Sequence, residues 1–93
     1  MKFEWDPKKA DANLAKHGVS FEDASTVFAD PLAGTIADPL HSESETRFIT
    51  MGRSAAGTLA VVVHADRDER IRIISARSAT SAERKRYESK TPD

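Results

Sequence analysis

Thr58-Leu59-Ala60-Val61-Val62-Val63-His64 is the stretch that decides the fold of this 93-residue chain. Its middle, Leu59 to Val63, is apolar on both faces of an extended strand, a pattern typical of a strand inside a sheet. Strand signals flank it at Thr46–Met51 and Arg70–Ala76, and the connections, such as Ala65–Glu69, are too short for a crossover helix. The pattern therefore predicts an antiparallel meander with residues 58–64 as its central strand.

Capping signals predict three helices around this meander. Asp6-Pro7 supplies an N-cap carboxylate and a first-turn proline for the first helix, which Gly18 ends by adopting a positive φ. Thr80-Ser81-Ala82-Glu83 is a capping box that starts the last helix. In chain order we expect a strand over 2–5, helices over 8–17 and about 21–28, a short strand over 35–37, the meander, and a helix over 81–89. The expected fold is α+β, one domain of residues 1–93 in the order β-α-α-β(3-4)-α, with the two N-terminal helices covering one face of an antiparallel sheet.

Composition limits the function classes. The chain has no cysteine, which excludes disulfides, thiolate metal sites and a cysteine nucleophile. Its histidines are isolated and it has no phosphate-binding glycine loop, so we expect neither a metal nor another cofactor. The N-terminus carries acids where a secretory signal needs apolar residues, and the longest apolar run is too short to span a bilayer. We therefore expect a cytoplasmic protein without a membrane partner.

Charge is distributed unevenly along the chain. Residues 1–46 carry 4 basic and 9 acidic side chains, whereas residues 47–93 carry 10 and 6 and include all the arginines. On a strand whose Ile71 and Ile73 face the core, Arg72 points away from the helices, where its guanidinium can bind phosphate. Arg77 has the opposite parity, so it joins Arg72 only if a bulge or a strand end near Ser75-Ala76 turns it.

The remaining chemistry is phosphate chemistry without a metal, for which RNA supplies its own 2′-hydroxyl nucleophile. Arg72 is the first candidate for binding the phosphoryl group, with a solvated ion pair to Glu45 or Glu69 as its structural alternative. Arg77 either assists Arg72 or pairs with Glu83. Glu45 and Arg47 share one strand face, as an ion pair or as an acid–base and phosphate couple. Further candidates for substrate binding, each with an alternative structural role, are Lys16, His17, Arg84 and Tyr87. The residues alone do not identify the general base.

Four segments together resemble the BrnT toxin family. They are Phe3-Glu4-Trp5-Asp6, Lys16-His17-Gly18-Val19-Ser20-Phe21, Glu45-Thr46-Arg47 with Gly52 downstream, and Ile71-Arg72-Ile73-Ile74-Ser75-Ala76-Arg77 followed by Glu83-Arg84 and Tyr87. The resemblance implies a ribonuclease toxin of a type II toxin-antitoxin module with a RelE-like fold and RNA as substrate. It also implies a BrnA-like ribbon-helix-helix antitoxin as partner, through which alone the toxin is associated with DNA.

A second hypothesis is a non-catalytic interaction module that docks an acidic protein partner or contributes to a DNA-bound repressor complex. The net charge of −1 and the lack of a helix-turn-helix pattern argue against direct DNA binding. Induced expression separates the two hypotheses, because a toxin arrests growth and a binding module need not.

Overall fold

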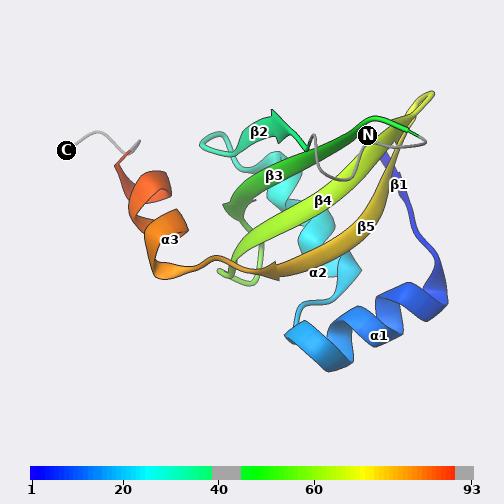
Figure 1. Ribbon diagram of the computed structural model, residues 1–93, viewed down its shortest axis with the longest axis horizontal. Coiled ribbons are helices and arrows are strands. Elements are labelled where there is room, and N and C mark those ends of the chain that lie inside the picture. Colours follow the sequence, from blue (N-terminus) through cyan, green and yellow to red (C-terminus); the bar gives the residue numbers. More distant parts are fainter. Residues whose placement is uncertain (39–44, 90–93) are drawn as a thin grey trace.

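The computed structural model describes residues 1–38 and 45–89 and has an α+β fold (Figure 1). Five strands form one sheet in the order β1-β5-β4-β3-β2. The strands are β1 (Lys2–Glu4), β2 (Gly34–Ala37), β3 (Arg47–Arg53), β4 (Leu59–Arg67) and β5 (Arg70–Ser78), and the α-helices are α1 (Pro7–His17), α2 (Phe21–Ser25) and α3 (Ser81–Glu88). The predicted meander is confirmed, and its central strand β4 is also the middle strand of the sheet. No helix in the described part of the chain is long and apolar enough to cross a membrane.

The expectation of a purely antiparallel sheet is wrong, because the sheet is mixed. β1 pairs in parallel with β5, with Phe3 opposite Ile71 and Glu4 opposite Arg72. The two strands are separated along the chain by all the other strands and two helices, so no local turn determines their direction. Parallel pairing needs such a long connection, and here tertiary packing selects it.

The helix ends follow the capping signals. Asp6 Oδ1 accepts a hydrogen bond from the Lys8 backbone N–H at 2.9 Å, and Gly18 ends α1 with φ +71°. The second helix is shorter than expected, because α2 passes into a 3₁₀-helix over Thr26–Ala29. α3 begins with the predicted capping box between Thr80 and Glu83.

α1 and α2 cover one face of the sheet, and α2 lies behind the strands in Figure 1. Most of the buried apolar core lies between these layers: Val19, Phe21, Ala24, Val27, Ala60, Val62, Ile73 and Ala76. Asn13 on α1 is also buried, and its side-chain amide donates to Ala76 O at 2.8 Å and accepts from Ala76 N at 3.1 Å. The amide therefore satisfies the edge of β5 beyond the end of β1, as a neighbouring strand would.

A β-bulge in β5 determines which way the arginines point. His64 is opposite Ile73 and Val63 is opposite Ser75, so Ile74 is an extra residue. This extra residue returns Ala76 to the helix side, and it gives Arg77 the same orientation as Arg72. A bulge was one of two ways in which Arg77 could join Arg72, and the bulge lies at Ile74, one residue before the expected position.

The hairpin between β4 and β5 is tighter than expected. Strand pairing continues to Arg67 opposite Arg70, so most of the segment predicted as the loop Ala65–Glu69 is strand. Only Asp68 and Glu69 form the turn, with Asp68 at φ 54°. Asp tolerates this left-handed conformation better than most residues, and no glycine or asparagine announces the turn in the sequence.

Candidate active site on the open sheet face

The face of the sheet opposite α1 and α2 is called the open face here. The pairing register places Glu4, Arg72, Ala65 and Arg47 in one row across β1, β5, β4 and β3. Neighbouring strands are about 4.8 Å apart, and the small side chain of Ala65 separates the two arginines. Arg72 therefore points away from the helices, as the alternation of β5 predicts.

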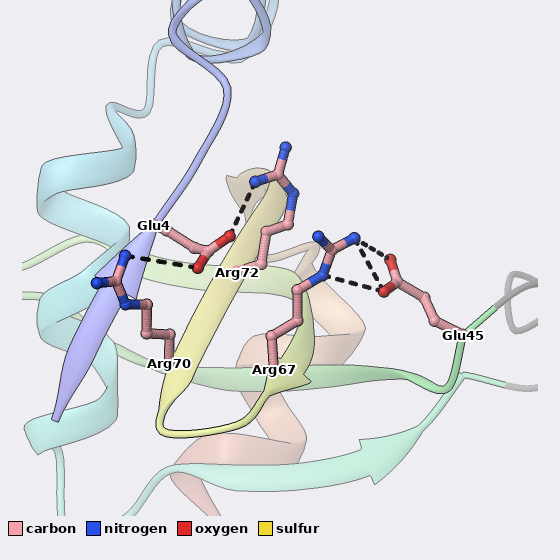
Figure 2. Close-up of polar contacts among 5 residues, drawn as sticks. All are labelled: Glu4, Glu45, Arg67, Arg70 and Arg72. Atoms are coloured by element: carbon pink, nitrogen blue, oxygen red, sulfur yellow. Dashed lines mark hydrogen bonds and ion pairs between the residues drawn. The ribbon is translucent and has the colours of Figure 1, made fainter.

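Glu4 lies between two guanidinium groups (Figure 2). Its Oε2 accepts a hydrogen bond from Arg72 Nη1 at 3.0 Å, and its Oε1 lies 4.0 Å from Arg70 Nη1. The Glu4 side chain is 26% exposed and that of Arg72 is 28% exposed. A carboxylate and a guanidinium are thus held in contact while solvent still reaches both of them.

Glu45 pairs with Arg67 across the same end of the sheet (Figure 2). Arg67 Nε donates to Glu45 Oε2 at 3.2 Å and Arg67 Nη2 donates to Glu45 Oε1 at 3.3 Å, so both carboxylate oxygens are bound. Such a two-pronged contact holds both side chains in place. The sequence suggested Arg47 as the partner of Glu45, and the structure shows a contact of Glu45 with Arg67.

These six residues, Glu4, Glu45, Arg47, Arg67, Arg70 and Arg72, are called the hairpin cluster here. Four arginines and two glutamates give these six residues a formal charge of +2, and the turn residues Asp68 and Glu69 beside them add two negative charges. Sequence reasoning missed Arg67, because it placed that residue in a loop. It also gave Glu4 no role, although alternation with Phe3 and Trp5 already directs Glu4 to the face opposite the core.

At the other end of the open face, Arg77 is bound to α3. Arg77 Nη1 donates to Glu83 Oε1 at 2.7 Å and Arg77 Nη2 donates to Glu83 Oε2 at 3.0 Å. The hydrogen bonds from Arg77 lower the pKa of Glu83 to about 2, against a smaller opposing effect of burial, and they raise the pKa of Arg77. Of the two roles considered for Arg77, the structure shows the pairing with Glu83.

Tyr87 anchors α3 through Asp30. Its hydroxyl donates to Asp30 Oδ2 at 2.6 Å, the same oxygen accepts from the Arg53 backbone N–H at 2.7 Å, and Leu32 N donates to Oδ1 at 2.9 Å. Burial disfavours the charged form of Asp30, but these hydrogen bonds outweigh it and lower its pKa. Only 5% of Tyr87 is exposed, and the Arg53 guanidinium lies 5.6 Å from its ring centre, so Tyr87 packs α3 against the body. We call Asp30, Arg53, Arg77, Glu83 and Tyr87 the α3 cluster.

The remaining candidates lie outside both clusters. Lys16 and His17 are exposed at the end of α1, beside Ile74 and Ser75 in a separate hollow. Arg84 is exposed on α3. The structure therefore brings Arg72, Arg47 and Glu45 together, places Arg77 and Tyr87 beside α3, and leaves the other three predicted binding residues apart.

Comparisons with known proteins agree with this architecture. Residues 5–83 match the family model described as the ribonuclease toxin BrnT of the type II toxin-antitoxin system. No curated protein sequence matches the chain. The crystal structure of the Brucella abortus ribonuclease toxin BrnT is similar, with a TM-score of 0.63 and 26% sequence identity over 87% of this chain and 99% of that one. The chain therefore belongs to the BrnT family of ribonuclease toxins of type II toxin-antitoxin systems.

Proposed function

We propose that this toxin is a metal-independent endoribonuclease that cleaves RNA by attack of the 2′-hydroxyl on the neighbouring phosphate, and that it acts in the cytoplasm to inhibit translation and growth. The observation that carries the proposal is the hairpin cluster, where four arginines lie at one end of the open face and Glu4 binds Arg72 through one nitrogen. Arginine keeps its charge at any working pH and binds phosphate oxygens through two parallel hydrogen bonds. The arginines on this face can therefore bind an RNA phosphate and stabilise the negative charge of the transition state.

Arg72 is the proposed phosphate-stabilising residue. Its contact with Glu4 uses Nη1, and among the described residues no other hydrogen bond to the Arg72 guanidinium is present, so Nε and Nη2 can donate to phosphoryl oxygens. Arg47 and Arg70 lie beside it, in the same row and two residues along β5 respectively. In this proposal they bind the phosphates on either side of the cleaved bond.

The other candidates receive different roles in this proposal. Glu45 orients Arg67, and Arg77 braces α3 through Glu83. Lys16, His17 and Arg84 contact only RNA that extends beyond the cluster, because they lie outside it. Tyr87 supports the position of α3 in place of stacking on a base.

The proposed partner is a BrnA-like ribbon-helix-helix antitoxin that covers the open face, since blocking access to phosphate is the simplest inhibition. Such a complex binds DNA through the antitoxin. Hydrogen exchange on the complex tests this, with added protection expected over residues 70–77 and 84–87. Unchanged exchange in both segments means that the antitoxin inhibits from another surface.

Cleavage in the presence of EDTA tests the proposed reaction. The wild-type toxin should still cut RNA and leave 2′,3′-cyclic or 3′-phosphate ends together with 5′-hydroxyl ends. Arg72→Ala should remain folded and lose cleavage, whereas the exposed Lys8→Ala on α1 is a control for removal of a distant positive charge. A strict requirement for Mg²⁺, or cleavage of RNA that carries a 2′-deoxy nucleotide at the cut site, excludes the mechanism.

A further inference from the structure

From the geometry of the hairpin cluster we infer that Glu4 is the general base that removes the 2′-hydroxyl proton. This inference rests on the proposed RNA cleavage and adds the proton-transfer residue to it. Glu4 lies on β1, directly opposite Arg72 in the parallel register. The backbone hydrogen bonds of the sheet therefore hold the base and the phosphate-binding group together on rigid elements.

The two oxygens of the Glu4 carboxylate have different surroundings. Oε2 is bound by Arg72 Nη1 at 3.0 Å, whereas Oε1 lies 4.0 Å from Arg70 Nη1, which is too long for a hydrogen bond. Oε1 can therefore accept a hydroxyl while Oε2 keeps Arg72 in place. In RNA the 2′-hydroxyl and the phosphoryl oxygens next to it lie close together. Glu4 Oε1 can accept the hydroxyl proton while the adjacent Arg72 donates to a phosphoryl oxygen.

Glu4 also has room for a substrate. It lines an open hollow of about 560 Å³ together with Lys2, Arg67 and Arg70 and with the turn residues Asp68 and Glu69. These three cations share the open face with Glu4, because Lys2 is opposite Arg70 and Arg67 is opposite Arg70 in the register. The hollow thus contains three cations that can bind RNA phosphates and three carboxylates, of which Glu4 is the one bound to Arg72.

The other acids and bases near the open face are less suited to this role. Asp68 and Glu69 are exposed in the turn, and no arginine of the described residues binds either carboxylate and holds it beside Arg72. Both oxygens of Glu45 are bound by Arg67. Glu83 is bound by Arg77 and by the Thr80 backbone N–H, and its pKa of about 2 makes it a weak base. His64 is 4% exposed, and its Nε2 lies 2.8 Å from Thr50 Oγ1 on the helix side of the sheet.

The proposed step balances without any further reagent. Glu4 takes the proton from the 2′-oxygen, which forms a bond to phosphorus while the bond from phosphorus to the 5′-oxygen breaks. Arg72 stabilises the negative charge on the phosphoryl oxygens during this exchange. Water gives a proton to the departing 5′-oxygen, and Glu4 then passes its own proton to the hydroxide that this leaves, so the products are a 2′,3′-cyclic phosphate and a 5′-hydroxyl.

Glu4→Gln tests the assignment, because a glutamine oxygen still accepts a hydrogen bond from Arg72 but is not a base. Cleavage of a short RNA should fall by about 100-fold or more, in the range that general bases contribute. The binding constant for the same RNA with 2′-O-methyl groups should stay within about threefold. The wild-type rate should fall as the pH is lowered through the acidic range, and this acidic limb should be absent in Glu4→Gln.

Matched variants make the result decisive. Glu22→Gln, exposed on α2 and outside the hollow, removes an equal charge and should cleave like the wild type. The inference is overturned if Glu4→Gln cleaves within about threefold of the wild type, or if its acidic limb remains. Loss of the acidic limb in Glu45→Gln alone assigns the base to Glu45. Metal-dependent cleavage by the wild type instead overturns the proposed function itself, so the two failures are distinguishable.

Discussion

Arg72 and Arg77 lie on the same strand and, because of the bulge at Ile74, point from the same face. Their surroundings differ. Arg72 belongs to the hairpin cluster, which contains three further arginines and in which Glu4 binds it through one nitrogen. Arg77 belongs to the α3 cluster, where Arg53 and Arg77 balance Asp30 and Glu83, and where Glu83 binds it through two nitrogens.

The comparison shows that residue type and orientation do not assign a role by themselves. A guanidinium whose donors are bound by one carboxylate holds two elements of the protein together. A guanidinium with unused donors, beside other positive charges, is suited to bind a phosphate. The hairpin cluster is thus the part of the open face that is built for a ligand, and the α3 cluster is the part that is built for support.

Alanine variants of the two arginines should show the largest effect, because one should lose cleavage and the other should lose stability. Arg72→Ala should lower the cleavage rate by about 100- to 1,000-fold, as removal of a transition-state donor does, with little change in melting temperature. Arg77→Ala should lower the melting temperature and reduce cleavage by less than about 10-fold. Cleavage assays and thermal unfolding of both variants measure this. Equal losses of cleavage would show that Arg77 also contacts the substrate.

Removal of Asp30 should break the support of α3. Asp30→Ala leaves Tyr87 Oη and the backbone N–H groups of Arg53 and Leu32 without their acceptor. Each hydrogen bond contributes about 0.5–1.5 kcal/mol, so the free energy of unfolding should fall by about 2–4 kcal/mol. Urea denaturation measures it, with the exposed Asp11→Ala on α1 as control. A change below about 1 kcal/mol would show that α3 is held by other contacts.

The pairing of Glu83 with Arg77 predicts a smaller, pH-dependent effect. The pKa of Glu83 is lowered from 4.5 to about 2, so the stabilisation is complete above pH 4.5 and is lost as the pH falls toward about 2. Because Arg77 remains 42% exposed, solvent screening reduces the effect to about 1 kcal/mol. Glu83→Gln should therefore destabilise the protein at pH 6 and much less at pH 2.5. Equal destabilisation at both pH values would mean that packing, and not charge, makes the difference.

The salt dependence of RNA binding gives the finest distinction between the two clusters. For single strands each phosphate contact contributes about 0.7 to the slope of log binding constant against log salt. Arg70→Ala, in the hairpin cluster, should reduce that slope by about 0.7, whereas Arg53→Ala, in the α3 cluster, should leave it unchanged. Titrations with 2′-O-methyl RNA at several salt concentrations measure it. A larger change of the slope in Arg53→Ala than in Arg70→Ala would show that RNA binds nearer to α3.

Local signals predicted most of the fold. The apolar run of β4, the Asp6 cap, Gly18 and the capping box at Thr80 all act within a few residues, so their outcomes follow from the sequence alone. The strand alternation of β5 also predicted that Arg72 points away from the helices. The tight turn at Asp68 escaped prediction, because its left-handed residue carries no glycine signal.

The candidate site was predicted only in part. Arg72, Arg47 and Glu45 were recognised as candidates, since their residue types suit phosphate chemistry. Glu4 and Arg67 acquired their partners only through the sheet, where Glu4 meets Arg72 across a parallel strand pair and Arg67 meets Glu45 across the hairpin end. Such contacts depend on strand order and register, which periodicity does not encode.

The sequence by itself determined the elements, the central strand and the gathering of every arginine in the second half of the chain. Hydrogen bonding and hydrophobic periodicity act over short distances, which is why these features are visible in the linear chain. Only the tertiary structure decided that β1 lies parallel to β5, that the bulge at Ile74 turns Arg77 toward the open face, and that Glu83 then binds it. These outcomes depend on which distant surfaces bury the most apolar area together, and that choice is made by the whole fold.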